Sequence, residues 1–187
     1  VGPFRPTWAE AAPGFPFIHR VLSRMFVDAE DAPEDRFASV MTAPNEQLTY
    51  FLSWLSHFYK SALRKTPAPG QAIVLAGAPS KGKTILTQCI LGQLMGGFVD
   101  GAPFLVEDDQ WSEDIVKAPI VYVDDSVAAT DPAAHRRFTA RTKKLVANGS
   151  IRSNGKFKAT GTVPWNGRIL ILCNLDSESL RILPDVE

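Results

Sequence analysis

A glycine-rich octapeptide between two apolar segments limits what this chain can fold into. Residues 77–84 read Gly-Ala-Pro-Ser-Lys-Gly-Lys-Thr and fit the pattern G-x-x-x-x-G-K-[ST] at every position. The apolar run Ala72–Ala76 before them has the length of a strand, and Thr84–Met95 after them has the composition of a helix. A loop of this pattern between a strand and a helix is typical of a phosphate-binding site. The sequence therefore predicts a phosphate-binding loop on an α/β sheet.

The residue types of this loop suit a nucleoside triphosphate. Glycines let the backbone approach phosphates closely, and the N–H groups at the start of the next helix attract negative charge. Lys83 is expected to reach the β- and γ-phosphates, and the Thr84 hydroxyl to join the coordination shell of Mg²⁺. The predicted cofactors are ATP and Mg²⁺; the alternative is a glycine turn with a surface lysine. The predicted nucleotide-binding residues are Gly77, Ala78, Pro79, Ser80, Lys81, Gly82, Lys83 and Thr84.

Two further apolar segments end in polar residues. Ile120–Val123 is followed by Asp124-Asp125, and Ile169–Cys173 by Asn174. Such runs are typical of parallel strands covered on both faces, as is Ala72–Ala76, and the carboxyl ends of these strands form the ligand-binding edge of a sheet. Asp124 is predicted to hold Mg²⁺ with Thr84, and Asp125 to orient or deprotonate the attacking water. Asn174 is predicted to act as a sensor that holds the attacking water or contacts the γ-phosphate. Lys83, Asp125 and Asn174 are therefore the predicted catalytic residues. The alternatives are a solvated strand end for the acids and an ordinary turn residue for Asn174.

Positive charge is concentrated between the second and third of these strands. Residues 132–175 hold nine Lys or Arg and no Asp or Glu, although the whole chain has a net charge of zero. Asn-Gly pairs at 148–149 and 154–155 indicate turns, and the second predicts a hairpin with Lys156, Phe157 and Lys158 on one strand. Cations follow a phosphate backbone and an exposed aromatic ring stacks on bases; the alternative is a solvated hairpin with Phe157 toward the core. The predicted nucleic-acid-binding residues are Lys143, Lys144, Arg152, Lys156, Phe157 and Lys158.

Composition and patterning define the domain organisation and exclude membrane insertion. Of the 187 residues, 45% are apolar and 21% charged, which is typical of a soluble globular protein. No apolar run approaches the roughly 18–20 residues that span a bilayer, and the first residues lack the pattern of a secretory signal. Cys89 and Cys173 lie in apolar surroundings, which favours buried thiols in a reducing compartment.

Residues 1–68 are predicted to be an irregular segment with a helix at Asn45–Leu63. Residues 69–187 are predicted to be an ATPase core that is truncated at its C-terminus.

Taken in order, the glycine loop, the acidic pair, the basic hairpin and the strand ending in Asn174 resemble the superfamily 3 helicases of viruses, phages and mobile elements, in particular the poxvirus and phage primase-helicase type. The resemblance covers Gln71–Leu175. It implies a three-layer P-loop NTPase core of the AAA+-like kind, with a mostly parallel sheet, an inserted basic β-hairpin and a helical N-terminal lead-in. It also implies a hexameric ring in the full-length protein, with ATP sites between subunits and hairpins that pull single-stranded DNA. An arginine from the neighbouring subunit belongs to that pattern, and Arg181, the one arginine after Asn174, does not match it.

The leading interpretation is an ATP-dependent nucleic-acid motor, a DNA helicase domain of a viral, phage or mobile-element replication protein. Its expected partners are single-stranded DNA or RNA and further copies of itself, and its expected location is the cytoplasm or a replication site in a host cell. One alternative is an AAA+-type ATPase for protein remodelling or DNA packaging. A second is a non-hydrolysing nucleotide-binding regulator, against which the second acid, Asp125, counts.

Overall fold

The chain divides into two units, Val1–Lys60 and Ser61–Glu187. The computed structural model describes residues 21–22, 25–26, 44–63, 68, 70–107, 112–124, 131–153, 161–176 and 179–183. The first unit contains most of helix α2 (Pro44–Ala62), which confirms the predicted helix. The Phe51 ring is buried on α2 and lies 4.8 Å, centroid to centroid, from the Phe26 ring. Among the described residues, no helix combines the length and the apolar character needed to cross a membrane.

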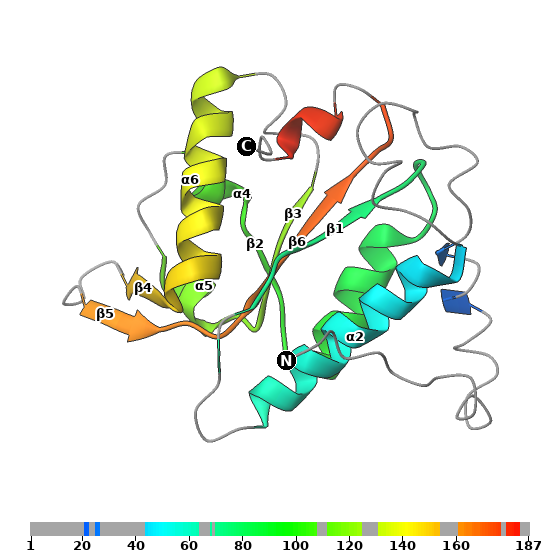
Figure 1. The fold of residues 1–187 in the computed structure, drawn as a ribbon. Coiled ribbons are helices and arrows are strands. Elements are labelled where there is room, and N and C mark those ends of the chain that lie inside the picture. Colours follow the sequence, from blue (N-terminus) through cyan, green and yellow to red (C-terminus); the bar gives the residue numbers. More distant parts are fainter. Residues whose placement is uncertain are drawn as a thin grey trace. The chain divides into compact units, whose positions relative to one another are not determined.

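Four parallel strands form the sheet of the second unit (Figure 1). Their order is β1 (Ile73–Ala76), β6 (Arg168–Cys173), β3 (Ile120–Asp124) and β2 (Val99–Asp100). All six residues of β6 are buried, as expected for a strand between two neighbours and two helical layers. The expectation that β1 is buried on both faces is wrong. This strand has β6 as its one neighbour in the described sheet, and only Leu75 of its four residues is buried.

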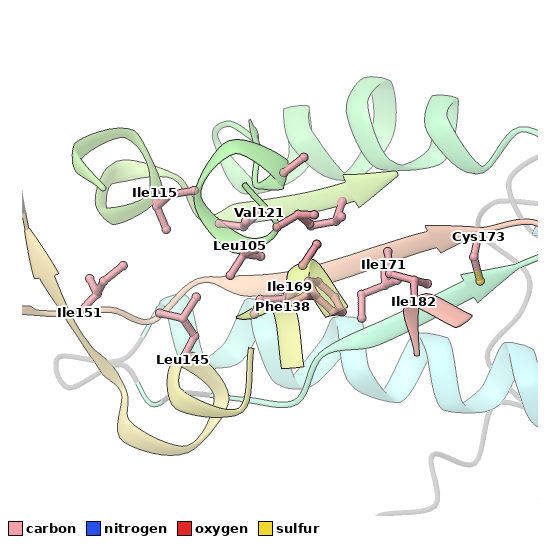
Figure 2. Packing of buried hydrophobic residues seen from close by; sticks show 14 of the residues in the cluster. Leu105, Ile115, Val121, Phe138, Leu145, Ile151, Ile169, Ile171, Cys173 and Ile182 are labelled. Atoms are coloured by element: carbon pink, nitrogen blue, oxygen red, sulfur yellow. The ribbon is translucent and has the colours of Figure 1, made fainter. Parts of the chain in front are cut away.

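Helices cover both faces of this sheet, an arrangement compatible with a three-layer α/β fold. One face packs against α4 (Ala102–Leu105), α5 (Glu113–Lys117) and α6 (Pro132–Asn148). A short 3₁₀ helix, η4 (Ser179–Ile182), adds Ile182 to the same core. Val121, Ile169 and Ile171 point from the strands into this core, where they meet side chains such as Phe138 (Figure 2). Alternate strand residues face the other way, as the period of a strand requires. On this second face, Tyr122 forms a hydrogen bond with Gln88, which belongs to the helix that follows the glycine loop.

The helix after the glycine loop runs from Lys83 to Met95 and is widened in its middle. The stretch η3 (Ile85–Leu91) is a π-helix, and α3 (Gly92–Met95) continues it. The predicted helix at this place is therefore confirmed, but its π-helical stretch has no signal in the sequence. Cys89 is exposed on η3 while Cys173 is buried on β6, so the expectation of a buried thiol is correct for Cys173 and wrong for Cys89.

Helix α6 carries much of the basic segment, and its start and end are encoded locally. The Asp131 carboxylate accepts hydrogen bonds from the backbone N–H groups of Ala133 (2.9 Å) and Ala134 (3.2 Å). These N–H groups, Ala133 first, hold the pKa of Asp131 below its usual value. Pro132 has no N–H and suits the first turn. Gly149 ends the helix in the left-handed region, with φ of 57°.

Strands β4 (Ser150–Ser153) and β5 (Gly161–Pro164) form the predicted antiparallel hairpin. Ser153 pairs with Gly161. The predicted turn at 154–155 lies outside the described residues. The base of the hairpin is anchored to the core: Ile151 is buried, and the Trp165 indole N–H after β5 donates to Ile115 O over 3.0 Å.

Candidate functional site

Three strands bring the residues at or just after their ends to one edge of the sheet. Strand β6 lies between β1 and β3 and runs parallel to both, so Gly77, Asp124 and Asn174 stand at the same carboxyl end. The backbone pairing continues one step beyond β1, where Gly77 N–H donates to Cys173 O over 3.1 Å. The expectation that these motifs share one edge is therefore confirmed, although the chain separates the glycine loop from Asn174 by about half its length.

The glycine loop contains two residues in the left-handed region of backbone conformation. Gly82 has φ of 86°, which suits glycine, and Ser80 has φ of 62°. Within the described residues, Ser80 is the one non-glycine residue with positive φ. Backbone strain of this kind is concentrated at ligand-binding loops. Turns that mix right- and left-handed residues also direct backbone N–H groups into a concavity that accepts an anion.

Lys83 stands at the centre of the site and links the loop to β6. Its Nζ donates to Gly77 O over 2.6 Å, to Ala78 O over 3.1 Å and to Asn174 Oδ1 over 3.1 Å. The first two acceptors belong to the loop itself, whereas Asn174 follows β6. Lys83 and Asn174 were predicted separately from the sequence, and the structure brings their side chains into direct contact.

The oxygen atoms predicted to hold a metal ion lie on two elements. Thr84 is exposed in the first turn of the helix and makes no side-chain capping bond there, and Asp124 is half-buried at the end of β3. A hydroxyl and a carboxylate are ligands that suit Mg²⁺, which usually takes few protein ligands and completes its shell with phosphate oxygens and water. The described residues contain no cluster of three or more His, Cys, Asp or Glu that could hold a metal ion by themselves. Asp125 lies outside the described residues.

Tyr122 connects the acidic strand to the helix after the loop. Burial raises the pKa of Tyr122, and the negative charge of Asp100 adds to the rise, whereas the hydrogen bond with Gln88 opposes it. The Phe98 ring lies 5.9 Å from the Tyr122 ring, centroid to centroid. The hydrogen bond with Gln88 joins η3 to β3 two residues before Asp124. Sequence reasoning missed this support, since Tyr122 lies within an apolar run.

The basic segment divides into structural and exposed cations. Arg137 donates to Val106 O, Arg141 to Phe104 O and Glu107 O, and Arg168 is buried and donates to three carbonyl oxygens. Arg168 is thereby removed from the surface, whereas the Arg137 side chain stays 37% exposed. The exposed basic residues among the described part of the segment are Arg136, Lys143, Lys144 and Arg152. Lys156, Phe157 and Lys158 lie outside the described residues.

Comparisons with known proteins give similarity of fold. No protein-family model matches the chain, and no curated protein matches it. Among solved structures, two apo structures of the C-terminal region of NrS-1 are similar. The first has 16% identity and a TM-score of 0.57 and covers 83% of this chain and 33% of that chain. The second has 15% identity and a TM-score of 0.56 and covers 84% of this chain and 32% of that chain. The chain thus spans about a third of the length of the structures that it matches.

Proposed function

We propose that this chain is the ATP-binding and ATP-hydrolysing core of a nucleic-acid motor, a DNA helicase domain of a viral, phage or mobile-element replication protein. The observation that carries the proposal is the contact between Lys83 and Asn174. These residues are 91 positions apart, and each follows a strand predicted from sequence to end at the ligand edge. A lysine that only stabilises the fold would not require a glycine loop with a strained residue, Ser80, on one side and the Asn174 amide on the other.

The proposed mechanism assigns one task to each polar group of the edge. The loop backbone and Lys83 bind the phosphates, and Thr84 with Asp124 would hold Mg²⁺. The chemistry that Mg²⁺ supplies when bound is neutralisation of negative charge on the phosphates. Asp125 orients or deprotonates the attacking water, and Asn174 contacts the γ-phosphate. The neighbouring strands β6 and β3 hold Asn174 and Asp124 in fixed register, since Asp124 pairs with Leu172.

Single-stranded nucleic acid is the proposed partner of the exposed cations. Lys143 and Lys144 lie in the last turns of α6, and Arg152 is exposed on β4, close along the chain. A surface with several cations binds a phosphate backbone without sequence preference. We extend the proposal to a hexameric ring of the full-length protein, which the resemblance to superfamily 3 helicases implies.

One observation favours the alternative of a remodelling or packaging ATPase. Among the described basic residues, Arg168 is buried, and Arg137 and Arg141 are partly buried and donate to backbone carbonyls, so the positive surface is smaller than the sequence suggests. An ATPase that acts on protein or duplex DNA needs the same nucleotide site without a single-strand surface. The two functions therefore differ in their response to single-stranded DNA.

The deciding experiment measures ATP hydrolysis of the full-length protein with and without single-stranded DNA. We expect hydrolysis in the presence of Mg²⁺ and a rise of severalfold on addition of single strands, because the proposed motor couples the two sites. Lys83→Ala serves as the inactive control. Hydrolysis that single-stranded DNA leaves unchanged would favour the remodelling or packaging alternative, and a wild type without hydrolysis would remove the motor proposal.

A further inference from the structure

All three N–H donors of the Lys83 ammonium group have a protein oxygen within hydrogen-bond distance. An ammonium group carries three donors and no acceptor. The acceptors are Gly77 O at 2.6 Å, Ala78 O at 3.1 Å and Asn174 Oδ1 at 3.1 Å. A phosphate oxygen can therefore form a good hydrogen bond with this lysine only by displacing one of the three. Which acceptor gives way determines how phosphate binding is linked to the rest of the site.

The three acceptors differ in how firmly they are held. The carbonyls of Gly77 and Ala78 belong to the loop backbone, and Gly77 is fixed further by its N–H bond to Cys173 O. Displacing either carbonyl requires the loop to change shape. The Asn174 oxygen is at the end of a side chain, which can turn to another staggered rotamer without moving the backbone. Asn174 is therefore the acceptor that a phosphate displaces at the lowest cost.

We propose that Asn174 is a positioning residue that competes with phosphate for Lys83 and thereby weakens nucleotide binding. This rests on the proposed nucleotide-binding function and adds a second task to Asn174. Phosphate binding at Lys83 releases the Asn174 amide, so Asn174 becomes available to the γ-phosphate only after the loop has been filled. Asn174 thus restrains Lys83 before the nucleotide binds and contacts the γ-phosphate afterwards.

The test uses ADP with Mg²⁺, because ADP lacks the γ-phosphate and so removes the other task of Asn174 from the measurement. Titration calorimetry gives the dissociation constants. Asn174→Ala is expected to bind ADP about three- to tenfold more tightly than the wild type, the change that follows from loss of one competing hydrogen bond. Asn174→Asp keeps an oxygen in place and adds negative charge, so it is expected to bind ADP about tenfold more weakly or worse. A merely structural role of Asn174 would weaken binding in both variants.

Two further measurements complete the design. Asn166→Ala is the matched control, the same substitution just before the opposite end of β6, and it should leave the ADP affinity unchanged. Without nucleotide, acetylation of the Lys83 amine by acetic anhydride, followed by mass spectrometry, should be faster in Asn174→Ala, because one acceptor is gone. Equal acetylation rates, or an ADP affinity of folded Asn174→Ala no tighter than that of the wild type, would overturn this proposal alone. A wild type that binds no ADP would overturn the proposed function as well.

Discussion

Asp124 and Asp125 are neighbours in the chain, yet the proposed mechanism gives them different tasks. Asp124→Asn should weaken nucleotide binding in the presence of Mg²⁺ and have little effect without it. Asp125→Asn should keep the nucleotide bound and slow hydrolysis by about 10²–10⁴-fold, the usual contribution of a general base. Binding titrations with and without Mg²⁺, combined with single-turnover hydrolysis, separate the two effects. Normal turnover of Asp125→Asn would mean that the tasks are reversed or that the acids are structural.

Individual site residues were predictable where a motif dictates them. Lys83 and Thr84 follow from the glycine pattern, and Asn174 follows from its place after a buried strand. The bond between Lys83 and Asn174 could not be predicted, because it depends on how β1 and β6 lie side by side. The positive φ of Ser80 could not be predicted either, because serine rarely adopts it. The roles of the arginines were not predictable either, since an arginine bonded to carbonyls and one facing solvent look alike in a sequence.

Arg168 is the residue that joins the central strand to the segment before β1. Its guanidinium donates to Ala68 O over 3.2 Å and to Asn166 O and Gly167 O over 3.0 Å each. It also packs so closely on Gly70 that a Cβ there would collide with it. Burial lowers the pKa of Arg168 from its usual value.

Arg168→Met should therefore lower the free energy of unfolding by about 2–4 kcal/mol, because several carbonyls lose a charged donor. Urea denaturation measures the change. The matched control, Arg136→Met, removes an exposed arginine of α6 and should change stability by no more than about 0.5 kcal/mol. Equal effects of the two substitutions would contradict the structural role of Arg168.

The lysines of α6 and the hairpin provide the test of nucleic-acid binding. Lys143→Ala with Lys144→Ala, and separately Lys156→Ala with Lys158→Ala, should weaken binding to single strands of different sequence to a similar degree. Each lost phosphate contact should reduce the slope of log affinity against log salt by about 0.7. Fluorescence anisotropy at several salt concentrations measures both quantities.

Lys117→Ala is the control for these variants, since Lys117 is exposed on α5 and paired with Glu113 over 2.6 Å. Its removal should leave the affinity and the salt slope unchanged. Should both double variants bind as tightly as the wild type, with the same salt slope, these lysines are not the contact, and the remodelling or packaging function becomes the better account.

Elements were predicted well where the apolar pattern is strong. The runs at β1, β3 and β6, and the spacing in α2, were assigned correctly from residue type alone. Helix α6 was missed because its buried stripe consists of Ala134, Phe138, Thr142 and Leu145, in which small and polar residues interrupt the apolar period. The pairing of β4 with β5 was predicted from the Asn-Gly signal, whereas the burial of Ile151 and Trp165 beside it was not, because it depends on contacts with distant segments.

The assembly of several chains into a ring is a proposal that hydrolysis assays can test. If neighbouring subunits complete each ATP site, as the resemblance to superfamily 3 helicases implies, hydrolysis per chain should rise with protein concentration, by roughly tenfold or more across the range in which rings form. Hydrolysis assays run beside analytical ultracentrifugation test this. A rate per chain that stays constant from monomer to oligomer would show that one chain forms a complete site.

Binding of ATP at Lys83 tests the central claim most directly. Titration calorimetry of the folded protein with ATP and Mg²⁺ should show one binding site per chain. Lys83→Ala removes the side chain that joins Gly77 and Asn174 at the loop, so it should weaken binding by about ten- to hundredfold while circular dichroism shows an unchanged fold. A wild type without ATP binding, or a folded Lys83→Ala protein that binds ATP as tightly as the wild type, would contradict the account.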